Sequence, residues 1–376
     1  MATVLNRPPT RGLDGVIAST SAVSSIEDDV LRYRGYRVEE LAERCGFEEV
    51  AYLLLNSSLP TGAELSTLGR TLGDFYELPG GLISAIEQLP HGAPMDVMRS
   101  AASLLALYDH EAEDGDREAN LRKATRLTAR LPVLTASLPA LLRGDKAPTP
   151  DSSLPITANF LWMLWGEEPE PEMARALEVA FILHADHELN ASTFAARVTA
   201  GTLAGIYAAI TAALAALQGP LHGGAGAQVL AALDAIGDER RVEAWLEVTL
   251  AEGRRVPGFG HRVYKNGDPR ALILKGLVQG LSRDSGEDRL YLVAARLEEQ
   301  MLERTGLLPN VDFYSAPLYE LLGIPRNLFP AVFASARIVG WCAHVMEQYE
   351  DNKLIRPRAL YTGHGPREWQ PIEARS

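Results

Sequence analysis

The sequence predicts an all-α protein with a minor β hairpin near its N-terminus. Apolar residues recur with helical periodicity along most of the chain. Runs rich in β-branched and aromatic residues are confined to residues 16–21 and 30–33. Strands and helices do not alternate, and the G-x-G at residues 258–260 follows no predicted strand, which argues against a dinucleotide-binding or phosphate-loop fold.

The hairpin is expected to turn at Glu27-Asp28-Asp29, a polar stretch between the two strand-like runs. Two short amphipathic helices are predicted at 38–45 and 48–55, broken by Gly46 and by residues 57–60. Further helices are expected at 63–75, 95–108 and 117–131. The polar, proline-rich residues 140–155 are expected to form a surface connection.

The second half of the chain continues the helical pattern. Pro171 is expected to open a helix over residues 172–187, and Asn190 or Ser192 to cap the next one. A helix at 203–217 should end at Gly219-Pro220. Later helices are predicted at 227–236, 240–251, 269–281, 290–304, 314–322 and 327–350.

The composition indicates a globular protein, because 47% of the residues are apolar and 23% are charged. A net charge of −13 argues against nucleic acid as a partner. Cys45 and Cys342 fit no disulfide or zinc pattern, and the N-terminal residues lack the apolar core of a signal peptide, so a cytoplasmic location is expected. Residues 198–217 are uncharged and long enough to span a bilayer, but their Ala, Gly and Thr content favours a buried helix over a membrane span.

Four histidines lie in unusual local sequences. His184 and His187 are expected one turn apart on the same helix, in HADHELN. His222 lies in PLHGGAG and His261 in GFGHRVYKNGDPR, where the glycines allow the backbone to approach a ligand closely. The second segment also carries Arg262, Lys265 and Arg270, which suits an anion with a reactive carbonyl. The simpler interpretations are a satisfied polar histidine for His184 and a solvated basic loop for the second segment.

Two charged residues have apolar neighbours. Asp312, in PNVDFYS, is interpreted either as a helix N-cap or as a partly desolvated general base, and nothing local separates the two. Arg337, in FPAVFASARIVGW, should either pair with an acidic residue or bind an anion.

Taken together and in this order, PLHGGAG, GFGHRVYKNGDPR, HADHELNAST, PNVDFYS and IRPRALYTG resemble the citrate synthase family over nearly the whole chain. The resemblance implies three catalytic residues. Asp312 would remove a proton from the acyl-CoA methyl group, His222 would hydrogen-bond the enolate oxygen, and His261 would polarise the oxaloacetate carbonyl. Gly226 stands where many relatives have Asn, which leaves the detail of the acyl-CoA side open.

The resemblance also implies binding residues and partners. The oxaloacetate contacts would be His187, Asn190, Arg270, Arg337 and Arg356, the last supplied by the other subunit of a homodimer. The coenzyme A edge would comprise Val256, Pro257, Gly258, Phe259, Gly260, Arg262 and Lys265. The expected substrates are oxaloacetate and acetyl-CoA, or propionyl-CoA in a 2-methylcitrate synthase, with no metal and no further cofactor. The expected fold has a large domain at 1–222 and 324–376, a small domain at 223–323, and the active site in the cleft between them.

Two other classes of protein remain as alternatives. A metal-dependent hydrolase could use His184, Asp186, His187 and Glu188 as ligands on one helix. A non-catalytic helical binding protein, such as an inactive paralogue, is the second, and the intact His222, His261 and Asp312 argue against it.

Overall fold

The computed structural model describes residues 11–13, 15–89, 92–286 and 288–375. The chain divides into two units, Ser21–Lys353 and a smaller unit of Met1–Thr20 with Leu354–Ser376. In the smaller unit, the described residues form only the short 3-10 helices Arg11–Leu13 and Ile372–Ala374. The larger unit contains every described α-helix and strand, and every expected site residue except Arg356.

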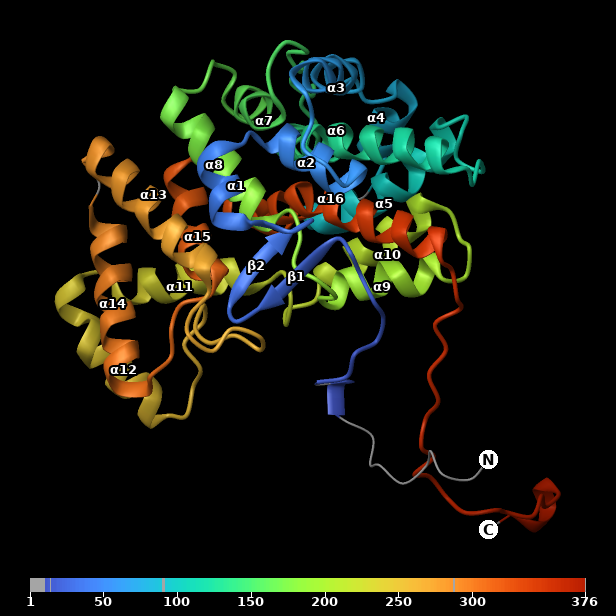
Figure 1. The fold of residues 1–376 in the computed structure, drawn as a ribbon. Helices are drawn as coiled ribbons and strands as arrows, with labels where there is room; N and C mark the ends of the chain where they lie inside the picture. The colour runs from blue at the N-terminus through green and yellow to red at the C-terminus, as the bar shows by residue number, and fades with distance from the viewer. Residues whose placement is uncertain (1–10, 14, 90–91, 287, 376) are drawn as a thin grey trace. The chain divides into compact units, whose positions relative to one another are not determined.

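The described residues of the larger unit form a mostly helical body with one small antiparallel sheet (Figure 1). The strands are β1 (Ser24–Glu27), β2 (Val30–Tyr33) and β3 (Tyr36–Arg37), in the order β1-β2-β3. The α-helices are α1 (Val38–Arg44), α2 (Phe47–Asn56), α3 (Gly62–Asp74), α4 (Gly80–Glu87), α5 (Pro94–Leu104), α6 (Arg117–Leu141), α7 (Ile156–Trp165), α8 (Pro171–His184), α9 (Ala191–Ala200), α10 (Ile206–Leu217), α11 (Ala225–Ile236), α12 (Val242–Ala251), α13 (Pro269–Ser285), α14 (Arg289–Thr305), α15 (Val311–Leu321) and α16 (Phe329–Glu350). The predicted all-α class is confirmed.

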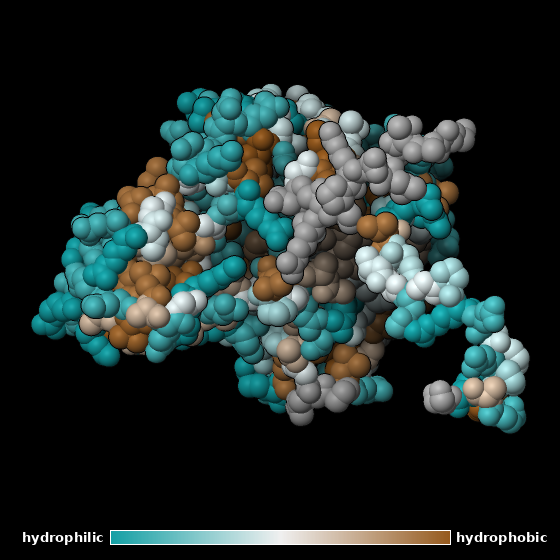
Figure 2. Space-filling model, turned by 90° about the horizontal axis from the view of Figure 1, so that it is seen from below, coloured by the Kyte–Doolittle hydropathy of each residue, from teal (hydrophilic) through white to brown (hydrophobic). Residues whose placement is uncertain are grey.

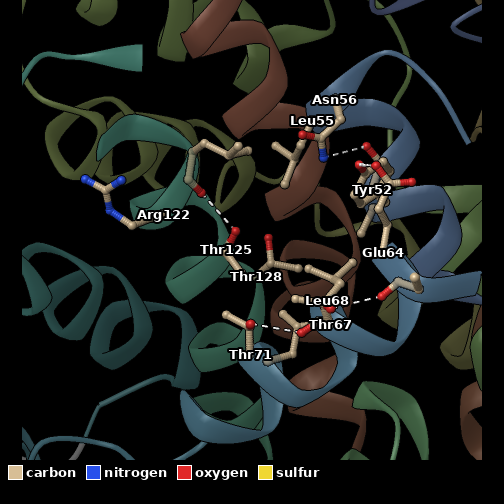
Figure 3. Close-up of a pocket in the computed structure, with 14 residues that line it drawn as sticks. Tyr52, Leu55, Asn56, Glu64, Thr67, Leu68, Thr71, Arg122, Thr125 and Thr128 are labelled. Carbon is tan, nitrogen blue, oxygen red and sulfur yellow. Dashed lines mark hydrogen bonds between the residues drawn. The ribbon is translucent and has the colours of Figure 1, made fainter. Parts of the chain in front are cut away.

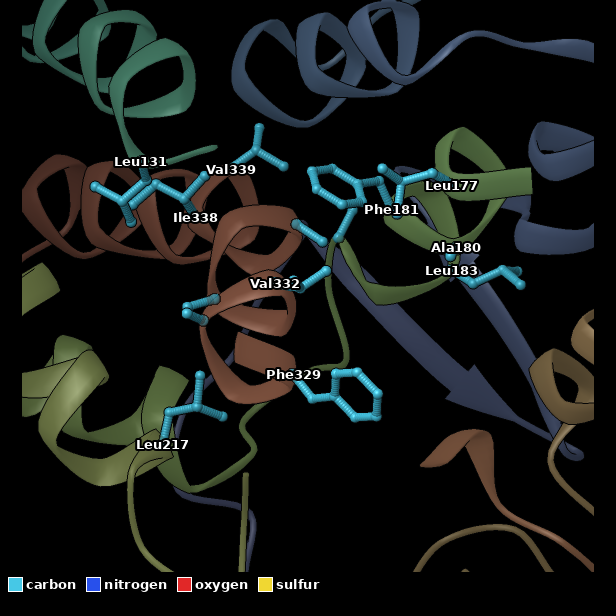
Figure 4. Close-up of a cluster of buried hydrophobic side chains, with 14 of the residues drawn as sticks. Leu131, Leu177, Ala180, Phe181, Leu183, Leu217, Phe329, Val332, Ile338 and Val339 are labelled. Atoms are coloured by element: carbon cyan, nitrogen blue, oxygen red, sulfur yellow. The ribbon is translucent and has the colours of Figure 1, made fainter. Parts of the chain in front are cut away.

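The core is built around α16, which is buried along nearly its whole length. Helices α2, α6, α8, α9 and α10 all contact it. Figure 4 shows Leu131 of α6, Phe181 of α8 and Leu217 of α10 around Val332 of α16. Each of these side chains is fully buried, which stabilises the fold by about 1.5–3 kcal/mol per residue.

The predicted hairpin has the wrong first strand. Residues 16–21 are irregular, and the strand that pairs with β2 is Ser24–Glu27, with Glu27 opposite Val30. The error arose because 16–21 is the more strand-like run in composition. Val23, directly before the observed strand, is fully buried, and tertiary packing of this kind can outweigh local strand propensity.

Several predicted helix limits are also wrong, including the end of α13, at Ser285 rather than 281, and the start of α15, at Val311 rather than 314. Helix α6 continues ten residues past 131 to Leu141, through Pro132 and Pro139, because packing against α7 and α16 outweighs the two missing N–H donors. Helix α8 ends at His184 rather than at 187, so His184 and His187 do not share a helix face. Helix α10 begins at Ile206 rather than 203. The helices α4 and α7 were not predicted.

One helix in the described part of the chain is long and apolar enough to cross a membrane, spanning residues 326–350. It includes α16, and 89% of its apolar window is buried inside the protein, as expected for a core helix. Residues 198–217 were expected to form one buried helix, and this is only partly right: α9 ends at Ala200, residues 201–205 form a break in which Leu203 is exposed, and the buried helix is α10. In the space-filling view, hydrophilic residues cover much of the coloured surface and hydrophobic residues form separate patches (Figure 2).

Candidate active site

His222 lies in the turn between α10 and α11, three residues before α11 begins. Its Nε2 is 2.8 Å from Oγ of Ser192, and the same oxygen accepts a hydrogen bond from Nε1 of Trp341 at 3.1 Å. Burial lowers the pKa of His222 to about 4, so the ring is neutral at physiological pH. The Ser192 hydroxyl can donate its one proton either to Asn190 Oδ1, at 2.7 Å, or to His222 Nε2. In the second arrangement, the His222 proton is on Nδ1.

His261 lies in the loop between α12 and α13, and its ring orientation is fixed by its own loop. The backbone N–H groups of Val263 and Tyr264 both donate to His261 Nδ1, at 3.0 and 3.2 Å. Because Nδ1 accepts, a neutral His261 carries its proton on Nε2 and presents that N–H as a donor. Burial, followed by the charge of Arg270, lowers the pKa of His261 and favours this neutral form.

Two backbone hydrogen bonds join the His261 loop to the residues just before α15, the helix on which Asp312 lies. Gly260 N donates to Leu308 O, and Asn310 N donates to Gly258 O, each at 2.9 Å. Both glycines have positive φ, 82° and 78°, and a Cβ on Gly258 would overlap the ring of Phe313. Only glycine fits there without displacing a neighbour, which accounts for the G-x-G pattern.

Asp312 is the second residue of α15, and Asn310 is the N-cap. The N-cap interpretation of Asp312 is therefore wrong. Burial raises the pKa of Asp312 to about 6, against the opposing effect of Arg270. A carboxyl group with this pKa is ionised at neutral pH but remains a much stronger base than an exposed aspartate.

His187 lies in the turn after α8 and faces the His261 loop. Its Nε2 is 3.0 Å from the Tyr264 hydroxyl, and the rings of His187 and His261 lie 5.2 Å apart, edge to face. Burial, followed by the charges of Arg270 and Arg337, lowers the pKa of His187 well below its usual value. Three neutral imidazoles therefore lie close to two guanidinium groups.

A buried polar network holds the turn that carries His187. The Asp186 carboxylate accepts hydrogen bonds from Ser24 Oγ and, at 3.2 Å, from His344 Nε2. His344 Nδ1 lies 3.2 Å from the guanidinium of Arg197, which can only donate, so the remaining His344 proton must face Asp186. His344 lies on α16 and Arg197 on α9, so the network fixes the turn to the core of the protein.

The same turn packs directly on α16 at Gly340. A Cβ on Gly340 would overlap the Ala185 carbonyl oxygen and the Asp186 carboxylate. No larger side chain fits at this position unless the turn moves.

Arg270 is fully buried and already paired. It donates from Nε and Nη2 to the two oxygens of Asp268, at 2.9 and 2.7 Å, and Asp268 caps α13. Asp268 also accepts from the Val311 N–H at 3.0 Å, next to Asp312. With this edge of the guanidinium occupied, the remaining Nη1 edge of Arg270 is the one available to an anion.

Arg337 has no acidic partner among the salt bridges of the described residues. Its Nε donates to the His184 carbonyl at 2.5 Å, and its guanidinium lies 4.7 Å from the centre of the Phe333 ring. Burial lowers the pKa of Arg337 to about 10, so the group remains cationic at neutral pH. A buried cation without a paired carboxylate favours the anion-binding interpretation over the structural one.

The other expected contacts are less distinctive. Asn190 caps α9 through its Oδ1, and its Nδ2 donates to Thr193 Oγ1 at 3.0 Å. Arg262 and Lys265 are exposed, Phe259 packs on Phe313 with ring centres 4.5 Å apart, and Val256 is buried. Arg356 is exposed and belongs to the smaller unit.

The ligand set of the metal-hydrolase alternative is not supported. Its four residues were expected on one helix, but α8 ends at His184, and the Asp186 carboxylate is engaged by Ser24 and His344. Among the described residues, no group of three or more His, Cys, Asp and Glu side chains could hold a metal ion.

A cavity of about 390 Å³ lies elsewhere, between α2, α3 and α6 (Figure 3). Leu68, Thr67, Thr71, Thr125 and Thr128 line it. The four threonine hydroxyls all donate to carbonyls of their own helices, so its wall offers few free donors. None of the expected site residues lines this cavity, and it plays no part in the chemistry below.

Sequence reasoning missed the residues that orient the site. Tyr264, Asp268, Trp341 and His344 act through contacts with residues far away in the chain. Asp268 had a usable signal, since Asp before Pro is a common helix start. Ser192 was considered only as a cap, whereas its side chain contacts His222.

The arrangement suits removal of a weakly acidic proton followed by carbon–carbon bond formation. Asp312 can act as the base, the two neutral histidines can donate hydrogen bonds to oxygens that gain negative charge, and Arg270 with Arg337 can hold a dicarboxylate. A water-poor site strengthens each of these interactions.

Comparison with known proteins supports the same kind of chemistry. The sequence model of the family described as "Citrate synthase, C-terminal domain" matches residues 12–358. The chain is 47% identical over 369 residues to citrate synthase 2 of Bacillus subtilis, covering 98% of this chain and 99% of that protein. It is 41% identical over 373 residues to 2-methylcitrate synthase 2 of Corynebacterium glutamicum, covering 97% of both chains.

A solved structure has the same fold. The citrate synthase of the thermophilic archaeon Thermoplasma acidophilum, in a ternary complex with carboxymethyl coenzyme A and oxaloacetate, superposes with a TM-score of 0.92. It is 36% identical in sequence, and the match covers 98% of this chain and all of that one.

Proposed function

The chain belongs to the citrate synthase family and is a transferase of that type, and we propose that it condenses acetyl-CoA with oxaloacetate to give citrate and free coenzyme A. The observation that carries the proposal is Asp312, a carboxyl group with a pKa of about 6 near the charges of Arg270 and Arg337. A base of this strength suits removal of a proton from a thioester methyl group.

The proposed first step forms an enolate. Asp312 takes a proton from the methyl group of acetyl-CoA while His222 donates a hydrogen bond to the thioester oxygen as it becomes negative. The lowered pKa of His222 supports this role, because a neutral ring can donate without already carrying charge. The contact with Ser192 fits this role in the arrangement where the hydroxyl donates to Nε2 rather than to Asn190, since the His222 proton is then on Nδ1.

The proposed second step forms the carbon–carbon bond. His261 donates from Nε2 to the ketone oxygen of oxaloacetate, the enolate carbon attacks the ketone carbon, and the new alkoxide takes a proton from His261. The bonds to His261 Nδ1 support this role, since they fix the proton on the other nitrogen. Water then cleaves the thioester and releases coenzyme A.

The proposal assigns oxaloacetate binding to His187, Asn190, Arg270 and Arg337, and the acyl-CoA edge to residues 256–260 with Arg262 and Lys265. It also includes a small domain at 223–323 and a large domain formed by the rest of the chain. We further propose a homodimer in which Arg356 completes the neighbouring site. In support, Arg356 is exposed and takes part in no salt bridge among the described residues.

The test is release of free thiol from acetyl-CoA in the presence of oxaloacetate. Turnover that requires both substrates is expected, with a higher kcat/KM for acetyl-CoA than for propionyl-CoA. One methylene is worth about 10–200-fold in specificity, so the preference is measurable. A clear advantage for propionyl-CoA would make the enzyme a 2-methylcitrate synthase and leave the proposed residue roles unchanged, whereas no turnover with either thioester would refute the proposal.

A further inference from the structure

The turn between β1 and β2 has left-handed backbone at both of its central residues. Glu27 pairs with Val30, so Asp28 and Asp29 form a two-residue turn, and both have positive φ, 51° and 61°. Turns of this kind favour Asn, Asp and Gly, which tolerate left-handed backbone best. Both aspartates therefore suit the turn, and what separates them is what their side chains contact.

The Asp29 side chain contacts the His261 loop. Its two carboxylate oxygens accept the backbone N–H of Lys265 at 2.9 Å and that of Asn266 at 3.0 Å. The side-chain amide of Asn266 donates a third hydrogen bond, at 2.6 Å. Asp28, in the same turn and the same backbone conformation, has no side-chain hydrogen bond among the described residues.

The segment that Asp29 holds is the one that orients His261. Lys265 and Asn266 are exposed, so packing contributes little to their position. They directly follow Val263 and Tyr264, whose N–H groups fix the His261 ring. The Tyr264 hydroxyl in turn contacts His187.

The charge of Asp29 also acts on His261. Burial and then Arg270 lower the pKa of His261, while the negative charges of Asp268 and Asp29 oppose that shift. The carboxylate of Asp29 thus acts on His261 through the field as well as through the loop.

We propose that Asp29 is a positioning residue for catalysis, which clamps the loop at 261–267 so that His261 presents Nε2 and Tyr264 reaches His187. The assignment of His261 to catalysis rests on the proposed function; the clamp itself does not. With the proposed domain limits, Asp29 belongs to the large domain and the loop to the small one, so the clamp joins the two proposed domains.

The variants Asp29→Gly and Asp28→Gly form a matched pair. Glycine adopts the left-handed turn without strain, so both substitutions preserve the hairpin, and only the first removes the carboxylate that holds the loop. With Asp29→Gly, the kcat/KM for oxaloacetate is expected to fall roughly tenfold, through a higher KM and a lower kcat, since charge-assisted hydrogen bonds are lost. Asp28→Gly should stay within about twofold of the parent. Asp29→Asn should recover part of the loss, because its one carbonyl oxygen can still accept a backbone N–H.

Hydrogen exchange gives a readout that does not depend on turnover. The amides of Lys265 and Asn266 should exchange faster in Asp29→Gly than in the parent or in Asp28→Gly, while the melting temperatures of the two variants stay similar. Equal kinetics for both glycine variants, or unchanged exchange at the two amides, would overturn the clamp. Absence of thiol release by the parent enzyme would instead refute the proposed function, and the exchange data would still decide the clamp.

Discussion

The side-chain amide of Asn310 donates to the Gly260 carbonyl at 3.0 Å, and so joins the two segments that carry Asp312 and His261. Gly260 directly precedes His261, and Asn310 also caps α15 by accepting from the Asp312 N–H at 3.1 Å. One side chain therefore couples the positions of the proposed base and the proposed acid.

Replacing Asn310 should separate these two functions. Asn310→Ala removes the cap and the link to Gly260, and a loss of about 1–2 kcal/mol in the free energy of unfolding is expected. Asn310→Asp retains the cap but loses the amide donor, so it should keep more of the stability while kcat still falls. Chemical denaturation and steady-state kinetics on the two variants check this; equal kcat for Asn310→Asp and the parent would contradict the coupling.

Asp312→Asn should nearly abolish turnover while oxaloacetate binding survives. The amide cannot take the proton, so the loss falls on the transition state, and kcat should decrease without a matching rise in the dissociation constant of oxaloacetate. Single-turnover thiol release and calorimetry of oxaloacetate binding measure the two quantities. Substantial turnover by a folded variant would remove Asp312 from its role.

The raised pKa of Asp312 also makes a prediction about stability. A carboxyl group whose pKa rises from 3.8 unfolded to about 6 folded binds its proton more tightly in the folded state, so stability is lost as the pH rises through that window. Asp312→Asn avoids this ionisation and should be more stable than the parent above pH ~7, by up to about 3 kcal/mol. The difference should vanish below pH ~4, where both forms are neutral. Denaturation midpoints across this range test the sign, and a parent enzyme of equal stability at high pH would contradict the shift.

The activity of the enzyme should change with pH in the opposite direction to its stability. The value of kcat/KM should rise with pH through about 6, because the base ionises there.

His344 should affect oxaloacetate binding without touching it. His344→Ala removes one of the donors to the buried Asp186 carboxylate and loosens the turn that carries His187. A loss of about 1–3 kcal/mol in stability is expected, together with a higher KM for oxaloacetate. Cys342→Ala on the same helix is the control, since Cys342 is fully buried and its loss should lower stability but leave that KM unchanged. Equal KM values for the two variants would reduce His344 to a packing role.

The proposed sharing of Arg356 is testable by complementation. Arg356→Ala and His261→Ala should each be nearly inactive, yet a mixture that forms heterodimers contains one site with both groups intact. Partial recovery of thiol release is expected after subunit exchange. No recovery, once exchange is demonstrated by labelled subunits, would place Arg356 in its own subunit's site or outside the site.

Much of the fold was predictable because a helix leaves a periodic pattern of apolar residues in its own local sequence. The periodic apolar residues marked most of the helices, and the glycines around His222 and His261 marked segments that approach other groups closely. The end of α8 at His184 was not predictable, since the apolar period continues past it. The turn that follows packs on Gly340, over 150 residues away, and no local pattern reports that contact.

The supporting residues of the site were beyond sequence reasoning for the same reason. Asp29 and Lys265 are 236 residues apart, and His344 and Asp186 are 158 apart. A turn aspartate and a histidine on an apolar helix carry no local mark of these partners. Likewise, whether Asp312 was a cap or a base depended on its burial, which only the packed fold supplies.

Gly340 has a consequence for how this chain can vary. Position 340 offers no room for a single methyl group, so a library randomised there should return glycine alone, whether it is screened for folding or for turnover. Selection for a stable core and selection for an active site therefore demand the same residue at position 340. No substitution there can exchange stability for activity, because the same change would disturb both α16 and the turn that carries His187.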